Sequence, residues 1–169
     1  MDHKEPLKDE RKISKGKILN LGSGGRPIVG SSNVVNLDMN PTSPYVDKVW
    51  DLERGLPFND NEFDQVICFH IFEHIRNLQQ LIGDIWRVTK HNAEIYIDAP
   101  HWSNPTFWDD ITHVRPWSDG VADKIAEMRF KKDVEGRFEV TLNGTIGKPW
   151  DYEKPMCCVV NLKTIKEKS

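Results

Sequence analysis

Residues 17–25 read KILNLGSGG, a short apolar run that stops at a cluster of glycines. A run of this length closed by glycines is typical of a buried strand that ends in a tight turn. Residues 33–38 repeat the pattern, because a second apolar run ends there on the carboxylate of Asp38. Glycines let a ligand approach the backbone, and a carboxylate accepts hydrogen bonds from ribose hydroxyls. The two stretches together predict a nucleotide-binding edge of a parallel sheet.

The rest of the chain alternates strands with helices. Apolar residues recur at three- and four-residue steps from Ile75 to Val88, which predicts a helix that starts near Ile71 and ends at 91–92. A helix between strands favours a parallel crossover. Ser118 is expected to cap a helix that runs through Met128. The remaining expected strands are 46–50, 63–69 and 94–98, followed by an antiparallel pair at 137–142 and 156–165.

Length and charge fit one globular domain that is not built to bind nucleic acid. The chain has 169 residues, with 23 Lys and Arg against 26 Asp and Glu. With a net charge of -3, the chain lacks the excess of basic residues that nucleic-acid binding needs. We expect a polar arm over residues 1–16 and a single domain over 17–169. The longest apolar run has five residues, Met156–Val160, and the first twenty residues hold no signal-like stretch, so we expect a cytoplasmic protein without membrane contact.

The glycine turn favours one class of nucleotide cofactor over another. A dinucleotide fingerprint that starts at Gly22 needs glycine at position 27, where the chain has Pro27. Residues 26–32 are too few for a full crossover helix, and a diphosphate depends on the N-terminus of that helix. S-adenosylmethionine carries no phosphate, so it tolerates a shortened crossover. The residues therefore favour an adenosyl cofactor of this kind.

The order of the motifs resembles that of class I S-adenosylmethionine-dependent methyltransferases, with the type 11 group most similar. The resemblance covers residues 17–117 and implies a Rossmann-like α/β sheet, mostly parallel, with an antiparallel C-terminal strand pair and an abbreviated first crossover. It departs from the family where Asn20 replaces an acid and where 89–92 replaces the usual Lys-Pro-Gly-Gly turn. Asn92 is expected to supply a left-handed conformation there. The motifs are LNLGSGG at 19–25, VNLD at 35–38, WDL at 50–52, LPF at 56–58, FD at 63–64, FEHI at 72–75 and RV at 87–88.

This resemblance implies the roles of individual residues. The glycine turn is expected around the methionine part of S-adenosylmethionine, Asp38 at the ribose hydroxyls and Asp51 at the adenine amino group. His70 is expected to face the transferred methyl group. Asp38 and Asp51 also have simpler readings, as a turn cap and as a solvated loop acid. The expected cofactor-binding residues are Leu21, Gly22, Ser23, Gly24, Asp38, Met39, Asp51, Leu52, Cys68 and Phe69.

Substrate contacts are expected from the loop 99–117, which follows the fifth strand and is rich in Trp. The resemblance extends to an Asp-x-x-His-x-Arg stretch in this loop, so His113 is expected as an acid/base or acceptor-orienting residue, with Asp110 setting its tautomer. In the alternative interpretation, His113 and Arg115 only pin the loop through main-chain bonds. A further role open to Arg115 is pairing with an acidic substrate group. Methyl transfer from a sulfonium is a direct displacement, which needs alignment more than a strong base. The expected partner is a small-molecule methyl acceptor, and the oligomeric state is not predicted.

Two other functions compete with methyl transfer. Residues 70–74 read HIFEH and match H-x-x-E-H, a zinc-peptidase motif in which both His bind zinc and Glu73 activates water. Such a site also needs a third ligand from downstream. The second alternative is a protein that binds S-adenosylmethionine without transferring its methyl group. The favoured interpretation includes no metal site.

Overall fold

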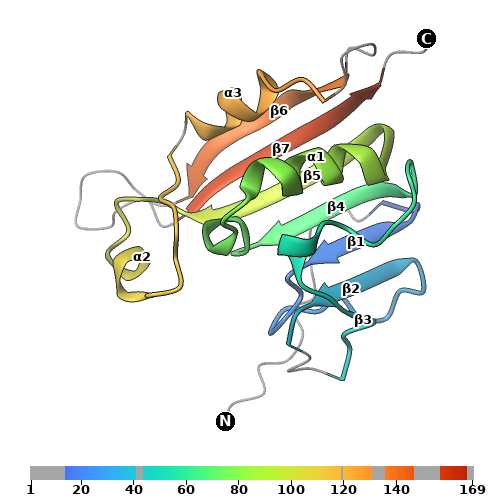
Figure 1. The fold of residues 1–169 in the computed structure, drawn as a ribbon, viewed down its shortest axis with the longest axis horizontal. Helices are drawn as coiled ribbons and strands as arrows, with labels where there is room; N and C mark the ends of the chain where they lie inside the picture. The colour runs from blue at the N-terminus through green and yellow to red at the C-terminus, as the bar shows by residue number, and fades with distance from the viewer. Residues whose placement is uncertain (1–13, 41–43, 119, 131–135, 147–156, 167–169) are drawn as a thin grey trace.

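A single seven-stranded sheet organises the chain (Figure 1). The computed structural model describes residues 14–40, 44–118, 120–130, 136–146 and 157–166. The strand order is β3-β2-β1-β4-β5-β7-β6. The expected polar arm, residues 1–16, lies outside the described residues apart from its last three. The strands are β1 (Ile18–Leu21), β2 (Val34–Asp38), β3 (Lys48–Val49), β4 (Phe63–Phe69), β5 (Thr89–Pro100), β6 (Gly136–Ile146) and β7 (Cys157–Lys166).

The pairing confirms the expected fold class. Strands β1 to β5 pair in parallel, and β7 pairs antiparallel with both β5 and β6. The chain leaves β1 toward β2 and β3, then returns to the other side of β1 as β4. This reversal creates a topological switch point between β1 and β4, the place where open α/β sheets bind ligands. Met156, the first residue of the expected strand 156–165, lies outside the described residues, and β7 runs to Lys166.

The first crossover is short, as expected, and polar side chains hold it in place. Residues 22–33 contain no helix. The side-chain amide of Asn36 accepts from the backbone N–H of Ile28 at 2.9 Å and donates to the Ile28 carbonyl at 3.0 Å. Asn20 donates from Nδ2 to Oδ1 of Asn36 at 2.9 Å. Two buried asparagines therefore hold the short crossover in place without a helix.

The long helix is shorter than its apolar pattern predicts. The helix α1 covers Leu78–Val88, and a separate 3₁₀ turn, η2 (Phe72–His74), precedes it. The prediction of a start near Ile71 was wrong because Ile75, with φ of -84° and ψ of 121°, is extended and ends η2 before α1 begins. Strand β5 begins directly after α1, and Asn92 supplies the expected left-handed conformation, with φ of 65°.

Two shorter helices follow β5. Helix α2 (Pro105–Asp109) lies inside the stretch predicted as loop, and α3 (Val121–Ala126) lies inside the predicted helix 118–128. Gly120, not Ser118, is the N-cap of α3, and no side chain caps it. The Ser118 carbonyl instead accepts from the backbone N–H of Val121 at 3.1 Å. The capping prediction was therefore wrong.

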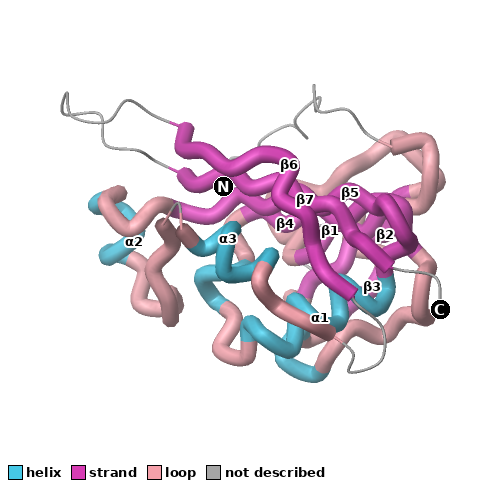
Figure 2. The backbone as a smooth tube through the Cα atoms, turned by 90° about the horizontal axis from the view of Figure 1, so that it is seen from above, coloured by secondary structure: helices cyan, strands magenta, loops and turns pink. Residues whose placement is uncertain are grey.

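One face of the sheet carries the larger core. Helices α1 and α3 lie on the same side of the strands (Figure 2), and their apolar residues pack with β4, β5 and β7. The other face holds a smaller cluster of Ile18, Ile28, Val34 and Ile67. No helix within the described residues is long and apolar enough to cross a membrane.

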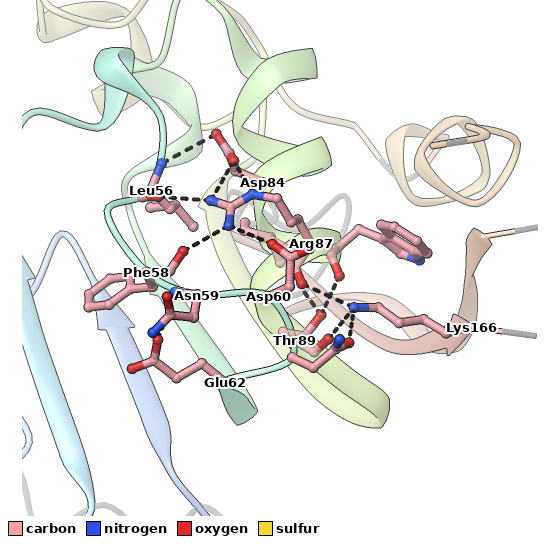
Figure 3. Close-up of polar contacts among 12 residues, drawn as sticks. Leu56, Phe58, Asn59, Asp60, Glu62, Asp84, Arg87, Thr89 and Lys166 are labelled. Carbon is pink, nitrogen blue, oxygen red and sulfur yellow. Dashed lines mark hydrogen bonds and ion pairs between the residues drawn. The ribbon is translucent and has the colours of Figure 1, made fainter. Parts of the chain in front are cut away.

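Arg87, in the last turn of α1, fixes the loop that precedes β4 (Figure 3). Its guanidinium donates to the carbonyls of Leu56 and Phe58, both at 2.8 Å, and pairs with Asp84 and Asp60. A planar guanidinium satisfies several acceptors at once, which a lysine does not. The LPF and RV motifs of the sequence therefore form a structural clamp at the amino end of β4, away from the switch point.

Candidate active site at the carboxyl ends of the parallel strands

A cleft of about 740 Å³ opens at the switch point. Its walls come from the segments that follow β1, β2, β3, β4 and β5. The arrowheads of β1, β2 and β4 point toward the side of the molecule where α2 lies (Figure 1), so these segments gather at one edge. A volume of this size suits a cofactor-sized ligand. The lining residues are Gly22, Asp38, Met39, Asn40, Asp51, Leu52, Glu53, His70, Ile71, His74, Ile75, Arg76, Ile111, Thr112 and Val114.

Gly22 lies in the floor of the cleft, where a side chain has no room. Its φ is +64°, and a Cβ placed on it would stand 2.7 Å from Cδ1 of Ile71. Both the backbone conformation and the contact require glycine at this position. The backbone of β1 therefore stays open to a ligand that enters from the cleft.

Two carboxylates line the cleft, and each also holds the backbone. Asp38 accepts from the backbone N–H of Gly24 at 2.8 Å through Oδ2 and from that of Asn40 at 2.9 Å through Oδ1. Asp51 caps a 3₁₀ turn, η1 (Leu52–Arg54), by accepting from the backbone N–H of Glu53 at 2.9 Å. Each carboxylate oxygen has a second lone pair, so capping leaves acceptor capacity toward the cleft. The capping and ligand-binding readings of these acids are therefore compatible.

The structure brings six of the residues expected from the sequence to the cleft: Gly22, Asp38, Met39, Asp51, Leu52 and His70. The others lie around it. Leu21 and Cys68 are fully buried in the larger core, and burial raises the pKa of the Cys68 thiol. Ser23 is buried behind the turn, and Phe69 packs against Tyr96 on the opposite face of the sheet with ring centroids 5.3 Å apart. Gly24 contributes its backbone N–H to Asp38.

His70 is flanked by two acids. Its Nδ1 lies 3.4 Å from Oε1 of Glu73, and its Nε2 lies 3.8 Å from Oδ1 of Asp98. The Glu73 carboxylate, followed by Asp98, raises the pKa of His70 against the opposing effect of burial. Cys157 lies 3.7 Å from Nε2, and burial together with the Asp98 carboxylate raises the pKa of that thiol to about 12. His70 therefore favours holding a proton at the wall of the cleft.

The stretch 101–117 is pinned to the segment after β4. The backbone N–H of Val114 donates to the Glu73 carbonyl at 2.8 Å. Oγ1 of Thr112 lies 2.9 Å from Nδ1 of His74, and Nη2 of Arg115 donates to the Arg76 carbonyl at 3.1 Å. Arg115 thus holds the main chain, which is one of the two roles expected for it. These contacts make 111–114 a fixed wall of the cleft.

The aromatic residues of this stretch divide into two groups. Trp102 and Trp108 are exposed, and Ile111, which lines the cleft, is 98% exposed. Trp117 and Phe107 are buried, so only two of these four aromatic side chains face solvent. Trp117 is buried because its backbone bridges to His101 and its ring packs on Phe72, which closes the stretch at its base.

His113, the leading catalytic candidate from the sequence, packs behind the cleft wall. Its ring stacks on Phe107 and meets His74 edge-on, both at centroid distances of 4.7 Å. Nδ1 of His113 lies 2.7 Å from the Phe107 carbonyl, and Nε2 lies 3.7 Å from Oδ2 of Asp110. The hydroxyl and backbone N–H of Thr112 lower the pKa of Asp110. The hydrogen bond to the Phe107 carbonyl places a proton on Nδ1 and thereby sets the tautomer.

The geometry of 70–74 does not fit the zinc-peptidase motif. That motif places two His on one helical face, whereas His70 ends β4 in a left-handed conformation and only η2 follows. Nε2 of His70 lies with Asp98 and Cys157, while His74 lies with Glu73 and His113. The two imidazoles of the motif therefore belong to different clusters.

Several lining residues were not predicted from the sequence. His74 was interpreted as a structural residue at a helix start, and Thr112, Asn40 and Glu53 were assigned no role. The H-x-x-E-H pattern was the available signal for His74. Thr112 carried a signal only through its place in the Asp-x-x-His-x-Arg stretch. Their meeting depends on contacts between segments almost forty residues apart, which local patterns do not encode.

Comparison with known proteins relates part of this chain to a methyltransferase family. Residues 28–97 match the type 11 methyltransferase family model, described as a methyltransferase domain. A ubiquinone biosynthesis O-methyltransferase of Rickettsia conorii is 28% identical over 120 residues, which cover 59% of this chain and 42% of that protein. The chain thus spans less than half the length of this curated relative.

Solved structures share the fold at low sequence identity. An S-adenosylmethionine-dependent methyltransferase from Archaeoglobus fulgidus is 15% identical with a TM-score of 0.60, covering 88% of this chain and 86% of that one. Another from Mesorhizobium loti is 14% identical with a TM-score of 0.60, covering 87% and 90%. Residues 28–97 are thus similar to a type 11 methyltransferase domain, and the chain shares the fold of S-adenosylmethionine-dependent methyltransferases.

Proposed function

We propose that this chain transfers a methyl group from S-adenosylmethionine to a small, largely apolar molecule that carries a hydroxyl group. The observation that carries the proposal is the cleft at the β1/β4 switch point, in which Gly22, Asp38 and Asp51 converge from three strand ends. The match of residues 28–97 to a methyltransferase domain supports S-adenosylmethionine as the cofactor. S-adenosylmethionine supplies, when bound, a methyl group on a positively charged sulfur, and transfer to an acceptor proceeds by direct displacement.

In this proposal, different residues at the cleft bind different parts of the cofactor. Gly22 leaves its backbone open to the cofactor, Asp38 accepts from ribose hydroxyls, and Asp51 accepts from the adenine amino group. Among the other residues expected from the sequence, Met39 and Leu52 supply apolar contact from the cleft wall. Leu21, Ser23, Gly24, Cys68 and Phe69 support the turn and the strand end from behind.

In this proposal, His70 accepts the proton that the hydroxyl group of the methyl acceptor loses. A hydroxyl acceptor loses its proton as the methyl group transfers, and a base at the cleft wall takes it up late in the reaction. The carboxylates of Glu73 and Asp98 stabilise the charged imidazole of His70. The His113 ring stacks on Phe107, and the exposed Asp110 carboxylate accepts from the backbone N–H and hydroxyl of Thr112. In this proposal both residues position the wall and do not contact the acceptor.

The apolar acceptor is inferred from the outer wall. Ile111 and Val114 line the cleft, and both side chains are exposed, as are Met39 on the opposite wall and the nearby Trp108. Exposed apolar side chains around a cleft mark a binding site for an apolar partner. The O-methyltransferase name of the Rickettsia relative supports an oxygen acceptor.

Binding of S-adenosylhomocysteine tests the cofactor. We expect one site per chain by isothermal titration calorimetry. At one hundred times the dissociation constant, this ligand should stabilise the fold by about 2.7 kcal/mol and raise the midpoint of thermal unfolding by about 5 to 10 °C. NAD serves as the control and should leave the midpoint unchanged. Absence of binding by the wild-type chain would overturn the proposal.

A panel of acceptors tests the chemistry. With S-adenosylmethionine labelled in the methyl group, hydroxylated aromatic compounds should become labelled, and sugars and primary amines of similar size should not. Tight cofactor binding with no labelled product across the panel would favour the alternative of a non-catalytic binding protein. If amines become labelled and phenols do not, the proposed oxygen acceptor is wrong, but the proposed methyl transfer is still supported.

A further inference from the structure

Glu73 is a buried carboxylate without hydrogen bonds. Its side chain is 0% exposed, and neither carboxylate oxygen has a hydrogen-bond partner among the described residues. The nearest polar atoms of the neighbouring imidazoles are Nδ1 of His70 at 3.4 Å and Nε2 of His74 at 4.0 Å. Burying a charged carboxylate is costly unless a positive charge or a metal ion compensates it. The surroundings of Glu73 must therefore supply positive charge.

Two imidazoles meet at this carboxylate with their other nitrogens already engaged. Ligand atoms of Glu73, His74 and His113 all lie within 4.8 Å of one another. Nδ1 of His74 lies 2.9 Å from Oγ1 of Thr112, and Nδ1 of His113 lies 2.7 Å from the Phe107 carbonyl. Metal-binding histidines have this arrangement, in which a hydrogen bond at one nitrogen orients the ring and leaves the other nitrogen as the ligand.

We propose that Glu73, His74 and His113 form a binding site for a divalent transition-metal ion of the zinc type. Two imidazoles and one glutamate are a ligand set that zinc uses in sites that keep one position open. His74 and Thr112 also line the cleft, so the open position lies on the cleft side of the cluster. Magnesium prefers an all-oxygen octahedral shell and fits this set poorly.

The geometry needs only side-chain movement to close on an ion. Zinc bonds of about 2.0 to 2.2 Å in a tetrahedron place ligand atoms about 3.3 to 3.6 Å apart. The backbone N–H of Val114 donates to the Glu73 carbonyl at 2.8 Å, which ties the two segments that carry the ligands. Small rotations of the rings and of the carboxylate therefore contract the cluster without moving the chain.

A neighbouring cluster provides the main rival site. His70, Asp98 and Cys157 also bring three ligand atoms within 4.8 Å. Nδ1 of His70 faces Glu73, so the two clusters share this carboxylate as a neighbour. The rival includes a thiol, and a thiolate ligand produces a charge-transfer absorption with cobalt that nitrogen and oxygen ligands lack. Cobalt therefore distinguishes the two sites.

The test measures metal binding in the absence of cofactor. The full chain, prepared without added histidines and stripped with a chelator, is titrated with zinc chloride by calorimetry. About one zinc ion per chain is expected. Glu73→Gln and His74→Ala should each weaken binding by at least about 30-fold. His91→Ala, which removes an exposed histidine of β5, is the matched control and should bind zinc as the wild type does.

Folding of the variants is checked separately. Glu73→Gln keeps the shape of the side chain and removes a buried charge, so its unfolding midpoint without metal should equal or exceed that of the wild type. Cobalt bound to the wild type should show visible ligand-field bands without thiolate charge transfer. The proposal is overturned by absence of zinc binding, by equal affinity in Glu73→Gln, or by a charge-transfer band that Cys157→Ser abolishes. Each of these results leaves binding of S-adenosylhomocysteine untouched, so the proposed function is judged independently.

Discussion

Gly22→Val should weaken the binding of S-adenosylhomocysteine by at least about 100-fold, equivalent to about 2.7 kcal/mol. A Cβ at this position stands 2.7 Å from Cδ1 of Ile71, and the γ-methyl groups of valine extend into the floor of the cleft. The φ of +64° adds a backbone strain of about 1 to 2 kcal/mol for an L-residue. Calorimetric titration of the folded variant measures the loss.

Gly30→Val separates backbone strain from obstruction of the cleft. Gly30 has a φ of +81°, but a Cβ there meets no atom within 4 Å. Both variants should lower the free energy of unfolding, whereas only the substitution at Gly22 should weaken the binding of S-adenosylhomocysteine. If Gly22→Val binds as tightly as Gly30→Val, the ligand does not approach the turn after β1, and the placement of the cofactor is wrong.

Asp38→Ala should weaken the binding of S-adenosylhomocysteine by about 1 to 3 kcal/mol, or about 5- to 150-fold. The substitution removes the proposed acceptor for the ribose hydroxyls. It also frees the backbone N–H groups of Gly24 and Asn40, which the carboxylate now holds at 2.8 and 2.9 Å. Both losses act on the binding turn, so the effect should appear in the dissociation constant measured by calorimetry. Asp38→Asn should give an intermediate value.

Asp47→Ala is the matched control for Asp38. Asp47 also holds a backbone N–H, that of Asn36, which donates to its Oδ2 at 2.7 Å, and it stands outside the cleft lining. Its loss should reduce stability and leave the dissociation constant unchanged. If both substitutions change the dissociation constant equally, Asp38 has a purely structural role in the turn.

The sheet was largely predictable because its signals are local. Short apolar runs closed by glycine or acid mark β1 and β2, and the helical period of 75–88 marks α1. The start of α1 was mispredicted because the apolar spacing continues through Phe72 and Ile75, although the extended backbone at Ile75 separates the 3₁₀ turn η2 from the helix. Hydrophobic periodicity reports which face is buried, and it does not report the backbone conformation that carries the residues there.

The sequence by itself determined where most strands lie, the short first crossover and the glycine and acid of the cofactor edge, since each depends on neighbours in the chain. Tertiary structure alone decided which side chains form the cleft wall built by the stretch 101–117 and the segment after β4. Thr112 meets His74, Val114 meets Glu73, and Arg115 meets Arg76 across nearly forty residues. It also decided that Glu73 lies buried and unbonded between imidazoles, because burial and charge balance depend on packing between segments that no local pattern connects.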